Sequence, residues 1–269
     1  MRAAVERAIN TMWDHYNEPL SLADLADTAI LSKFYFSRVF RDQTGTSPGR
    51  FLTAIRLFKA KGLLQHTLLS VTDISYQVGY NSLGTFTSRF TRSVGMSPAR
   101  FRAFTRTGIH DINRPPAAGL GQRVSTVTGS VTVPPTEGAV RVYVGAFKEP
   151  IVQGFPVACA VLNGPGRYRL DALPDGLWYV RATVLALDSQ PRRRSHQPLF
   201  VGSSAPMTVR SGRAEADIDT RPLCLLDMPI LLALPELDCH FSGSACTPAA
   251  SSPWSREARS ELTRQAYPA

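Results

Sequence analysis

The chain has 269 residues and a hydrophobic content of 43%, which allows two globular domains that each bury a core. Its longest apolar run, near Ile230–Leu234, is too short for a membrane span, and its first 20 residues lack the apolar core of a secretion signal. Its 4 cysteines are too sparse for a disulfide scaffold, so we expect a cytoplasmic protein.

Positive charge is concentrated in the first half of the chain. Residues 1–108 carry 14 Lys and Arg against 7 Asp and Glu, whereas residues 109–269 carry 16 against 14. This balance indicates a polyanionic partner such as nucleic acid, although a solubilising surface would have the same charge.

The first half has the apolar spacing of short amphipathic helices. Ser21, with Asp24 at the capping-box position, predicts the start of a short helix. Ser32 and Gly45 predict the two ends of the next helix, and Pro48 begins a long one. In chain order, the predicted helices cover residues 4–16, 22–29, 33–44 and 48–64.

The same pattern then appears a second time. Residues 36–51 and 86–101 are identical at 7 of 16 aligned positions. In the second copy, we expect Thr72 to cap the short helix, with Gly79 at its end or in the turn that follows. Asn81 or Ser82 is expected to cap a helix over Leu83–Val94, Gly95 to stop it, and Pro98 to begin the last helix.

Each copy therefore consists of a short helix, a tight turn and a second helix. The second helix carries a phenylalanine pair at i, i+4 that we assign to the core: Phe36 and Phe40 in one copy, Phe86 and Phe90 in the other. This geometry lets a second helix enter the DNA major groove, although a plain helical bundle would show the same pattern. Outside the Phe pairs, hydroxyl and Arg side chains, which contact phosphates and bases, favour the DNA-binding interpretation.

The long helix explains the separation of the two copies. Two reading helices must reach major-groove segments about 34 Å apart to lie on one face of DNA. Residues 48–64 would span about 25 Å as a helix, so one chain could contact two adjacent groove segments.

These residues resemble the DNA-binding domain of the AraC/XylS family of bacterial transcription regulators. The resemblance covers residues 5–105, including "LADLADTAILSKFYFSRVFRDQTGTSPGRFL", "RLFKAKGLL" and "DISYQVGYNSLGTFTSRFTRSVGMSPARFR". It implies seven helices, of which the third and sixth insert into adjacent major grooves. Carried over by position, it implies that the base-facing residues are Phe34, Ser37, Arg38, Leu83, Gly84, Thr85, Thr87 and Ser88. The implied phosphate-contacting residues are Ser32, Lys33, Tyr35, Arg41, Asn81, Ser82, Arg89 and Arg92.

Three features depart from the family pattern. Ile30 lies where the first turn usually has Gly, and because a β-branched residue disfavours positive φ, we expect a reshaped turn and shallower docking. Gly84 offers no side chain to the bases. The DNA-binding half also comes first, whereas the family commonly places its sensor domain first.

After residue 108, a Pro- and Gly-rich linker over 109–123 leads into alternating apolar segments over 124–222 that predict an all-β antiparallel sandwich. The stretch "GRYRLDALPDGLWYVRATVLAL" resembles the transthyretin-like sandwich of carboxypeptidase regulatory domains. An apolar, Pro-flanked segment over 223–241 would pack on the sandwich or contact a partner, and residues 242–269 have the composition of a disordered tail.

The second half contains none of the catalytic motifs that would indicate an enzyme. Paired catalytic carboxylates, H-E-x-x-H, a P-loop and G-x-S-x-G are all absent from the sequence. Cys159 lies between apolar neighbours and predicts an inert buried thiol. Cys239, His240 and Cys246 supply only part of a metal-ligand set, so we expect neither a metal nor another cofactor. The basic run "PRRRSH" at 191–196 is expected to be a solvated loop.

We therefore expect a two-domain transcriptional regulator that is not an enzyme and binds double-stranded DNA. By analogy, the β domain would sense a small-molecule effector, form a homodimer or bind a partner, and RNA polymerase is the further partner we expect. The alternatives are a DNA- or sugar-directed enzyme that uses the helical half as a targeting arm, and a scaffold whose helical half binds protein.

Overall fold

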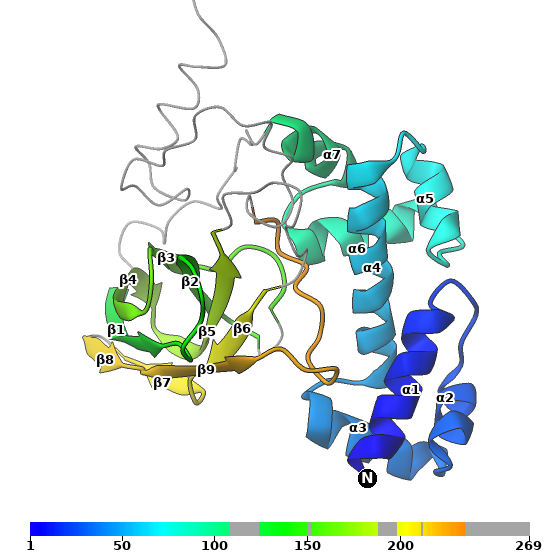
Figure 1. The fold of residues 1–269 in the computed structure, drawn as a ribbon, viewed down its shortest axis with the longest axis horizontal. Helices are drawn as coiled ribbons and strands as arrows, with labels where there is room; N and C mark the ends of the chain where they lie inside the picture. The colour runs from blue at the N-terminus through cyan, green and yellow to red at the C-terminus, as the bar shows by residue number, and fades with distance from the viewer. Residues whose placement is uncertain (108–123, 150–151, 188–197, 211, 235–269) are drawn as a thin grey trace, which may run out of the picture. The chain divides into compact units, whose positions relative to one another are not determined.

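The computed structural model describes residues 1–107, 124–149, 152–187, 198–210 and 212–234, which form a helical unit and a β unit (Figure 1). The helical unit contains residues 1–102 together with the short segments 152–154 and 223–233. The expected linker, the 191–196 run, the Cys239–His240–Cys246 group and the expected tail lie outside the described residues.

The helical unit contains the seven helices that the family resemblance implies. The helices are α1 Arg2–Asp14, α2 Leu22–Ala29, α3 Lys33–Thr44, α4 Pro48–His66, α5 Val71–Gln77, α6 Leu83–Val94 and α7 Pro98–Thr107. The predicted bounds of α3 and α6 are confirmed, since Gly45 and Gly95 end them in the left-handed conformation at φ 72° and 95°. The first helix ends at Asp14, two residues earlier than the 4–16 pattern predicted.

Both short helices begin with the same capping box. Ser21 accepts a hydrogen bond from the Asp24 amide while the Asp24 carboxylate accepts one from the Ser21 amide, as predicted. Ser70 and Asp73 repeat this arrangement at the start of α5. The prediction of Thr72 as the cap was therefore wrong: Ser70 is the residue with an acidic side chain three positions later, and the helix begins at Val71.

The turns after α2 and α5 differ from each other. Ile30 adopts φ 60° and ψ 46°, so the expected reshaping of this turn was wrong: the isoleucine itself takes the left-handed conformation. Its side chain is 80% exposed, so the β-branched group has room in solvent and little packing depends on its direction. In the second copy, the left-handed position is Gly79 at φ 84°. A Cβ there would lie 2.8 Å from the Asn17 carbonyl oxygen, so this position needs glycine for space as well.

The predicted phenylalanine core is confirmed in both copies. Phe36, Phe40, Phe86 and Phe90 are all 0% exposed. The Phe36 and Phe40 rings lie 5.5 Å apart, and Phe40 lies 5.5 Å from Phe51. The equivalent rings of Phe86, Phe90 and Phe101 are 5.6 and 5.7 Å apart. The edge-on contacts of Phe40 with Phe51 and of Phe90 with Phe101 hold each second helix to the helix that follows it.

The β unit is a curved, barrel-like sheet in the order β3-β2-β5-β6-β9-β1-β4, with β7 paired to β5 and β8 to β1 (Figure 1). Its strands are β1 Val124–Thr132, β2 Val140–Phe147, β3 Ala158–Leu162, β4 Gly166–Pro174, β5 Gly176–Ala186, β6 Phe200–Ser203, β7 Met207–Val209, β8 Arg213–Glu215 and β9 Ile218–Pro222. The expectation that the strands pair antiparallel was wrong for β1, which pairs in parallel with both β8 and β9.

Gly129 makes this parallel pairing sterically feasible. A Cβ at Gly129 would lie 2.1 Å from the Ala216 carbonyl oxygen, so only glycine lets the chain pass this close to β1. Asp217 then accepts hydrogen bonds at 2.7 Å from both the amide and the hydroxyl of Ser130, and these bonds lower the pKa of its carboxyl. Asp217 lies between the end of β8 and the start of β9.

The core of the β unit lies inside the curved sheet. Trp178, Val142, Leu170 and Ile218 are among its buried residues, and the Trp178 indole donates to the Pro174 carbonyl oxygen at 2.8 Å. Cys159 in β3 is half-buried and not buried as expected, since β3 pairs only with β2 in the described sheet.

Candidate nucleic-acid interface

Helix α3 separates its core residues from an exposed face. Phe36, Val39 and Phe40 are buried, whereas Phe34 is 92% exposed on the opposite side. Ser37 is half-exposed, and Lys33, Tyr35, Arg38 and Arg41 are exposed. Phe34 lies one helical turn before the exposed Arg38, so an apolar ring and a guanidinium share the exposed face of α3.

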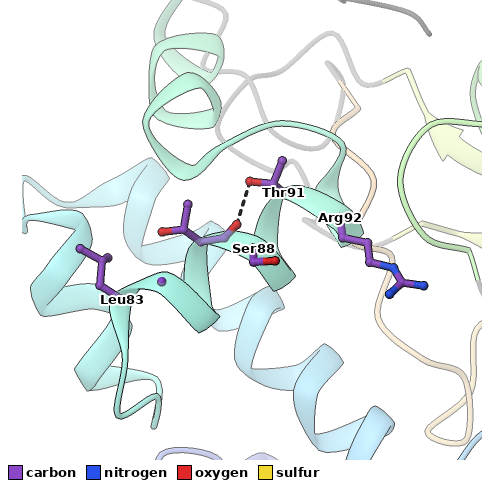
Figure 2. A pocket seen from close by; sticks show the side chains of 6 residues that line it. Leu83, Ser88, Thr91 and Arg92 are labelled. Atoms are coloured by element: carbon purple, nitrogen blue, oxygen red, sulfur yellow. Dashed lines mark hydrogen bonds between the residues drawn. The ribbon is translucent and has the colours of Figure 1, made fainter.

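Helix α6 presents the equivalent face of the second copy. Figure 2 shows an open depression lined entirely by this helix. Its lining residues are Leu83, Gly84, Thr87, Ser88, Thr91 and Arg92. Thr91 was not among the residues that the family resemblance implied, and its hydroxyl donates to the Thr87 carbonyl oxygen within the helix at 2.7 Å. Thr85 is exposed but does not line this depression.

The N-terminal ends of the two helices differ in their caps. The Ser82 hydroxyl accepts a hydrogen bond from the Thr85 amide at 3.4 Å, so the end of α6 is capped within the chain. Ser32 makes no side-chain cap at the start of α3. The first amides of α3 therefore have no capping side chain, an arrangement that suits a phosphate.

Arg89 has a contact inside the protein as well as an exposed position. Its guanidinium donates to the Thr53 hydroxyl in α4 at 3.3 Å, which links the second copy to the helix that joins both copies. Tyr80 is buried close by, and this burial raises the pKa of its hydroxyl, while Arg89 and Arg56 act in the opposite direction.

Several basic residues of α4 serve structural roles. Arg56 donates to the carbonyl oxygens of Tyr16 and Glu18 at 2.6 and 2.7 Å, which fixes the turn after α1. The Lys59 ammonium lies 5.4 and 5.2 Å from the ring centres of Trp13 and Tyr16. Lys61 is only 4% exposed. The net charge of residues 1–108 therefore overstates the charge available to a polyanion.

No group of acidic, His or Cys side chains within the described ranges has the arrangement of a metal site. Among the helices that the structure describes, none is both long enough and apolar enough to cross a membrane.

The helical unit defines a class of protein module. Residues 25–103 match the family model described as "Helix-turn-helix domain". This part of the chain is therefore similar to the helix-turn-helix domains of known proteins.

Known proteins align with the same region. The transcriptional activator RhaS of Enterobacter sp. (strain 638) is 39% identical over 89 residues, which cover 33% of this chain and 32% of that protein. The uncharacterized transcriptional regulator YdeC of Bacillus subtilis (strain 168) is 34% identical over 98 residues, or 36% of this chain and 34% of that protein. The chain thus spans about a third of the length of these curated relatives, whose names describe transcriptional regulators.

Solved structures align over the same part of the chain. The DNA-binding domain of AdpA, crystallised with a target DNA, is 30% identical with a TM-score of 0.36, and the match covers 37% of this chain and 89% of that one. An AraC-type regulator from Chromobacterium violaceum is 29% identical with a TM-score of 0.37, over 38% of this chain and 92% of that one.

Proposed function

We propose that this protein is a sequence-specific transcriptional regulator that inserts α3 and α6 into adjacent major grooves of double-stranded DNA. The observation that carries the proposal is that two copies of one buried phenylalanine framework each display an exposed helix face. Phe34, Ser37 and Arg38 form that face on α3. Leu83, Gly84, Thr87 and Ser88 form it on α6, next to the exposed Thr85.

The residue types suit base recognition in both copies. Arg38 can donate two hydrogen bonds to a guanine edge, and the hydroxyls of Ser37, Thr87 and Ser88 can accept or donate to several bases. The apolar side chains of Phe34 and Leu83 suit thymine methyl groups. Gly84 exposes backbone in place of a side chain, which allows close approach of the helix to the DNA.

Phosphate contacts then set the register of the protein on the duplex. Ser32, Lys33, Tyr35 and Arg41 surround α3, and Asn81, Ser82, Arg89 and Arg92 surround α6. Because cations neutralise phosphates and release counterions, affinity falls as salt rises. Arg89 would exchange or share its Thr53 contact when it binds a phosphate.

Helix α4 sets the separation of the two reading helices. Its 19 residues give a rod about 28 Å long between the two copies. This length is close to the roughly 34 Å that separates successive major-groove segments on one face of DNA.

For the β unit, we propose a regulatory module that senses an effector, forms a dimer or binds a partner, with RNA polymerase as the partner in transcription. The transthyretin-like resemblance of residues 166–187 supports such a binding module. The AraC-type domain ahead of it supports regulation and not catalysis.

Selection from random duplex DNA by the full-length chain tests the proposal. We expect an enriched site with two half-sites about one helical turn apart. Arg38→Ala should relax one base position of this site, whereas Arg213→Ala, an exposed arginine of β8, should leave the selected site unchanged. Recovery of only unrelated sequences at about 100 mM salt would contradict the proposal.

A further inference from the structure

The chain that leaves the β unit returns to the helical unit. Strand β9 ends at Pro222, and the next residues, 223–233, group with the helices (orange in Figure 1). We call residues 223–233 the strap. Its first part packs against the core of the first helix–turn–helix copy through Leu225, Leu226 and Met228. A turn in which the Cys224 amide donates to the Asp227 carboxylate at 2.8 Å shapes this part of the strap.

The middle of α4 holds the next part of the strap through a buried lysine. The Lys61 ammonium donates to the Leu232 carbonyl oxygen at 3.2 Å and lies 5.4 Å from the ring centre of Phe101. Lys61 is 4% exposed, and an ammonium at such a site needs hydrogen-bond acceptors and π density to replace water. The strap supplies one of these compensating groups.

The last part of the strap reaches the recognition helix of the second copy. The Ala233 amide donates to the Val94 carbonyl oxygen at 3.3 Å, and the Gly154 amide donates to the Ser93 carbonyl oxygen at 3.0 Å. The final carbonyls of a helix have no partner within the helix, so these two bonds satisfy the end of α6. Leu231, Leu232 and Ala233 are 3, 8 and 0% exposed, which shows that this end of the strap is part of a packed core.

The strap therefore contacts both copies and the helix that joins them. Its 11 residues reach at most about 40 Å when extended, enough to follow the roughly 28 Å of α4. The predicted base-facing side chains Phe34, Arg38 and Thr85 stay exposed with the strap in place, so the strap does not block the reading faces.

We propose that the strap is an intramolecular splint that holds the two reading helices at one separation, and that it makes DNA binding responsive to the β unit. Leu223 follows the last residue of β9 directly in the chain. The DNA part of this inference rests on the proposed function.

Hydrogen exchange of the full-length protein tests the splint without DNA. Within the strap, the amide of Ala233 should be protected because it donates to the Val94 carbonyl of α6. Exchange of the Ala233 amide at the rate of an unfolded chain would overturn the proposal in the native protein, with no substitution needed.

Two substitutions then release the strap in different ways. Leu226→Asp places a charge against the core of the first copy, and we expect exchange roughly tenfold faster across residues 223–233 and in the last turn of α6. Lys61→Met keeps the apolar stem but removes the donor to Leu232, and it should loosen residues 231–233. The matched control is Leu68→Asp, since Leu68 is 84% exposed, and it should leave both regions unchanged. Unchanged exchange in Leu226→Asp and Lys61→Met would also overturn the proposal.

A DNA series separates the splint from the proposed function. With base pairs inserted between the two selected half-sites, the native protein should prefer one spacing, and Leu226→Asp should lose most of this preference. Sequence-specific binding with the same spacing preference in Leu226→Asp would refute the splint and leave the regulator intact. If no sequence-specific binding exists, the proposed function fails, while the exchange experiment still decides whether the strap holds the two copies together.

Discussion

In the first helix–turn–helix copy, the rings of Phe36, Phe40 and Phe51 form a chain of contacts, and in the second copy Phe86, Phe90 and Phe101 form the same chain. Each short helix also begins with a capping box made by a serine and an aspartate three residues later. The exposed faces differ, because each predicted base-facing residue of one copy has a different residue at the equivalent position of the other. Phe34 corresponds to Gly84, for example, and Arg38 corresponds to Ser88. Duplication thus kept the residues that fold each copy and changed the residues that would read DNA.

The turns show a second difference between the copies. Ser21 and Ser70 are 49 residues apart, as are the left-handed residues Ile30 and Gly79, whereas Ser32 and Ser82 are 50 apart. The second turn therefore has one extra residue, which places Tyr80 in the core at 7% exposure. It also brings Gly79 against Asn17, so the second turn is packed where the first is open to solvent.

Removal of a core ring should cause the largest effect. Phe40→Ala and Phe90→Ala should each lower the free energy of unfolding by about 3–5 kcal/mol, because each leaves a cavity among buried rings. Denaturant titration of the full chain measures this change. Phe34→Ala is the matched control, since Phe34 is 92% exposed, and should change stability by less than about 0.5 kcal/mol. Equal losses at Phe34 and Phe40 would show that α3 is oriented differently.

Gly79→Ala should cost about 2–3 kcal/mol of unfolding free energy, since it adds both a left-handed strain and a clash with the Asn17 carbonyl. Gly45→Ala separates these two causes: its φ is 72°, but nothing lies within 4 Å of the added Cβ. We expect a loss of about 1–2 kcal/mol there. A smaller loss at Gly79 than at Gly45 in thermal or chemical unfolding would mean that the packing of the second turn is unimportant.

Arg38→Ala should weaken binding to the selected DNA site by about 1–3 kcal/mol. Ser88→Ala, at the equivalent position of the second copy, should cost only about 1 kcal/mol, because a hydroxyl makes single hydrogen bonds where a guanidinium makes two. Fluorescence anisotropy with the selected duplex and with single-base variants measures both. An unchanged base preference in Arg38→Ala would remove this residue from the reading face.

Ile30→Gly should cause the smallest effect and should stabilise the protein. Relief of the left-handed strain contributes about 1–2 kcal/mol, and the greater chain entropy of glycine offsets about 0.5–1 kcal/mol of this gain. The side chain is 80% exposed, so its removal costs little packing. Thermal unfolding measures this change. The control is Ile30→Val, which keeps the β-branch and should give no gain in melting temperature. A lower melting temperature in Ile30→Gly would show that the side chain has a role in packing.

The features that could be predicted from sequence are those that depend on neighbouring residues. Ser32 and Gly45 predicted the ends of α3, and the Phe pairs at i, i+4 predicted which faces are buried. The exposed faces followed because they are opposite those pairs. Ile30 could not be predicted in the same way, since local preference argued against its conformation and the geometry of the turn overrode that preference.

Contacts between residues far apart in the chain could not be predicted from the sequence. Lys61 reads as one more surface charge of a basic helix, yet a carbonyl 171 residues later accepts its hydrogen bond. The parallel pairing of β1 with β9 likewise depends on the approach of Ala216 to Gly129, which no local pattern reveals.

By itself, the sequence determined that residues 1–107 form a duplicated helix–turn–helix framework, because helix caps, glycine stops and periodic phenylalanines act over only a few residues. Tertiary structure decided which charges point outward, how the β strands pair and where residues 223–233 pack. These outcomes depend on which surfaces meet when the chain folds, and burial of apolar area and satisfaction of buried polar groups select among them.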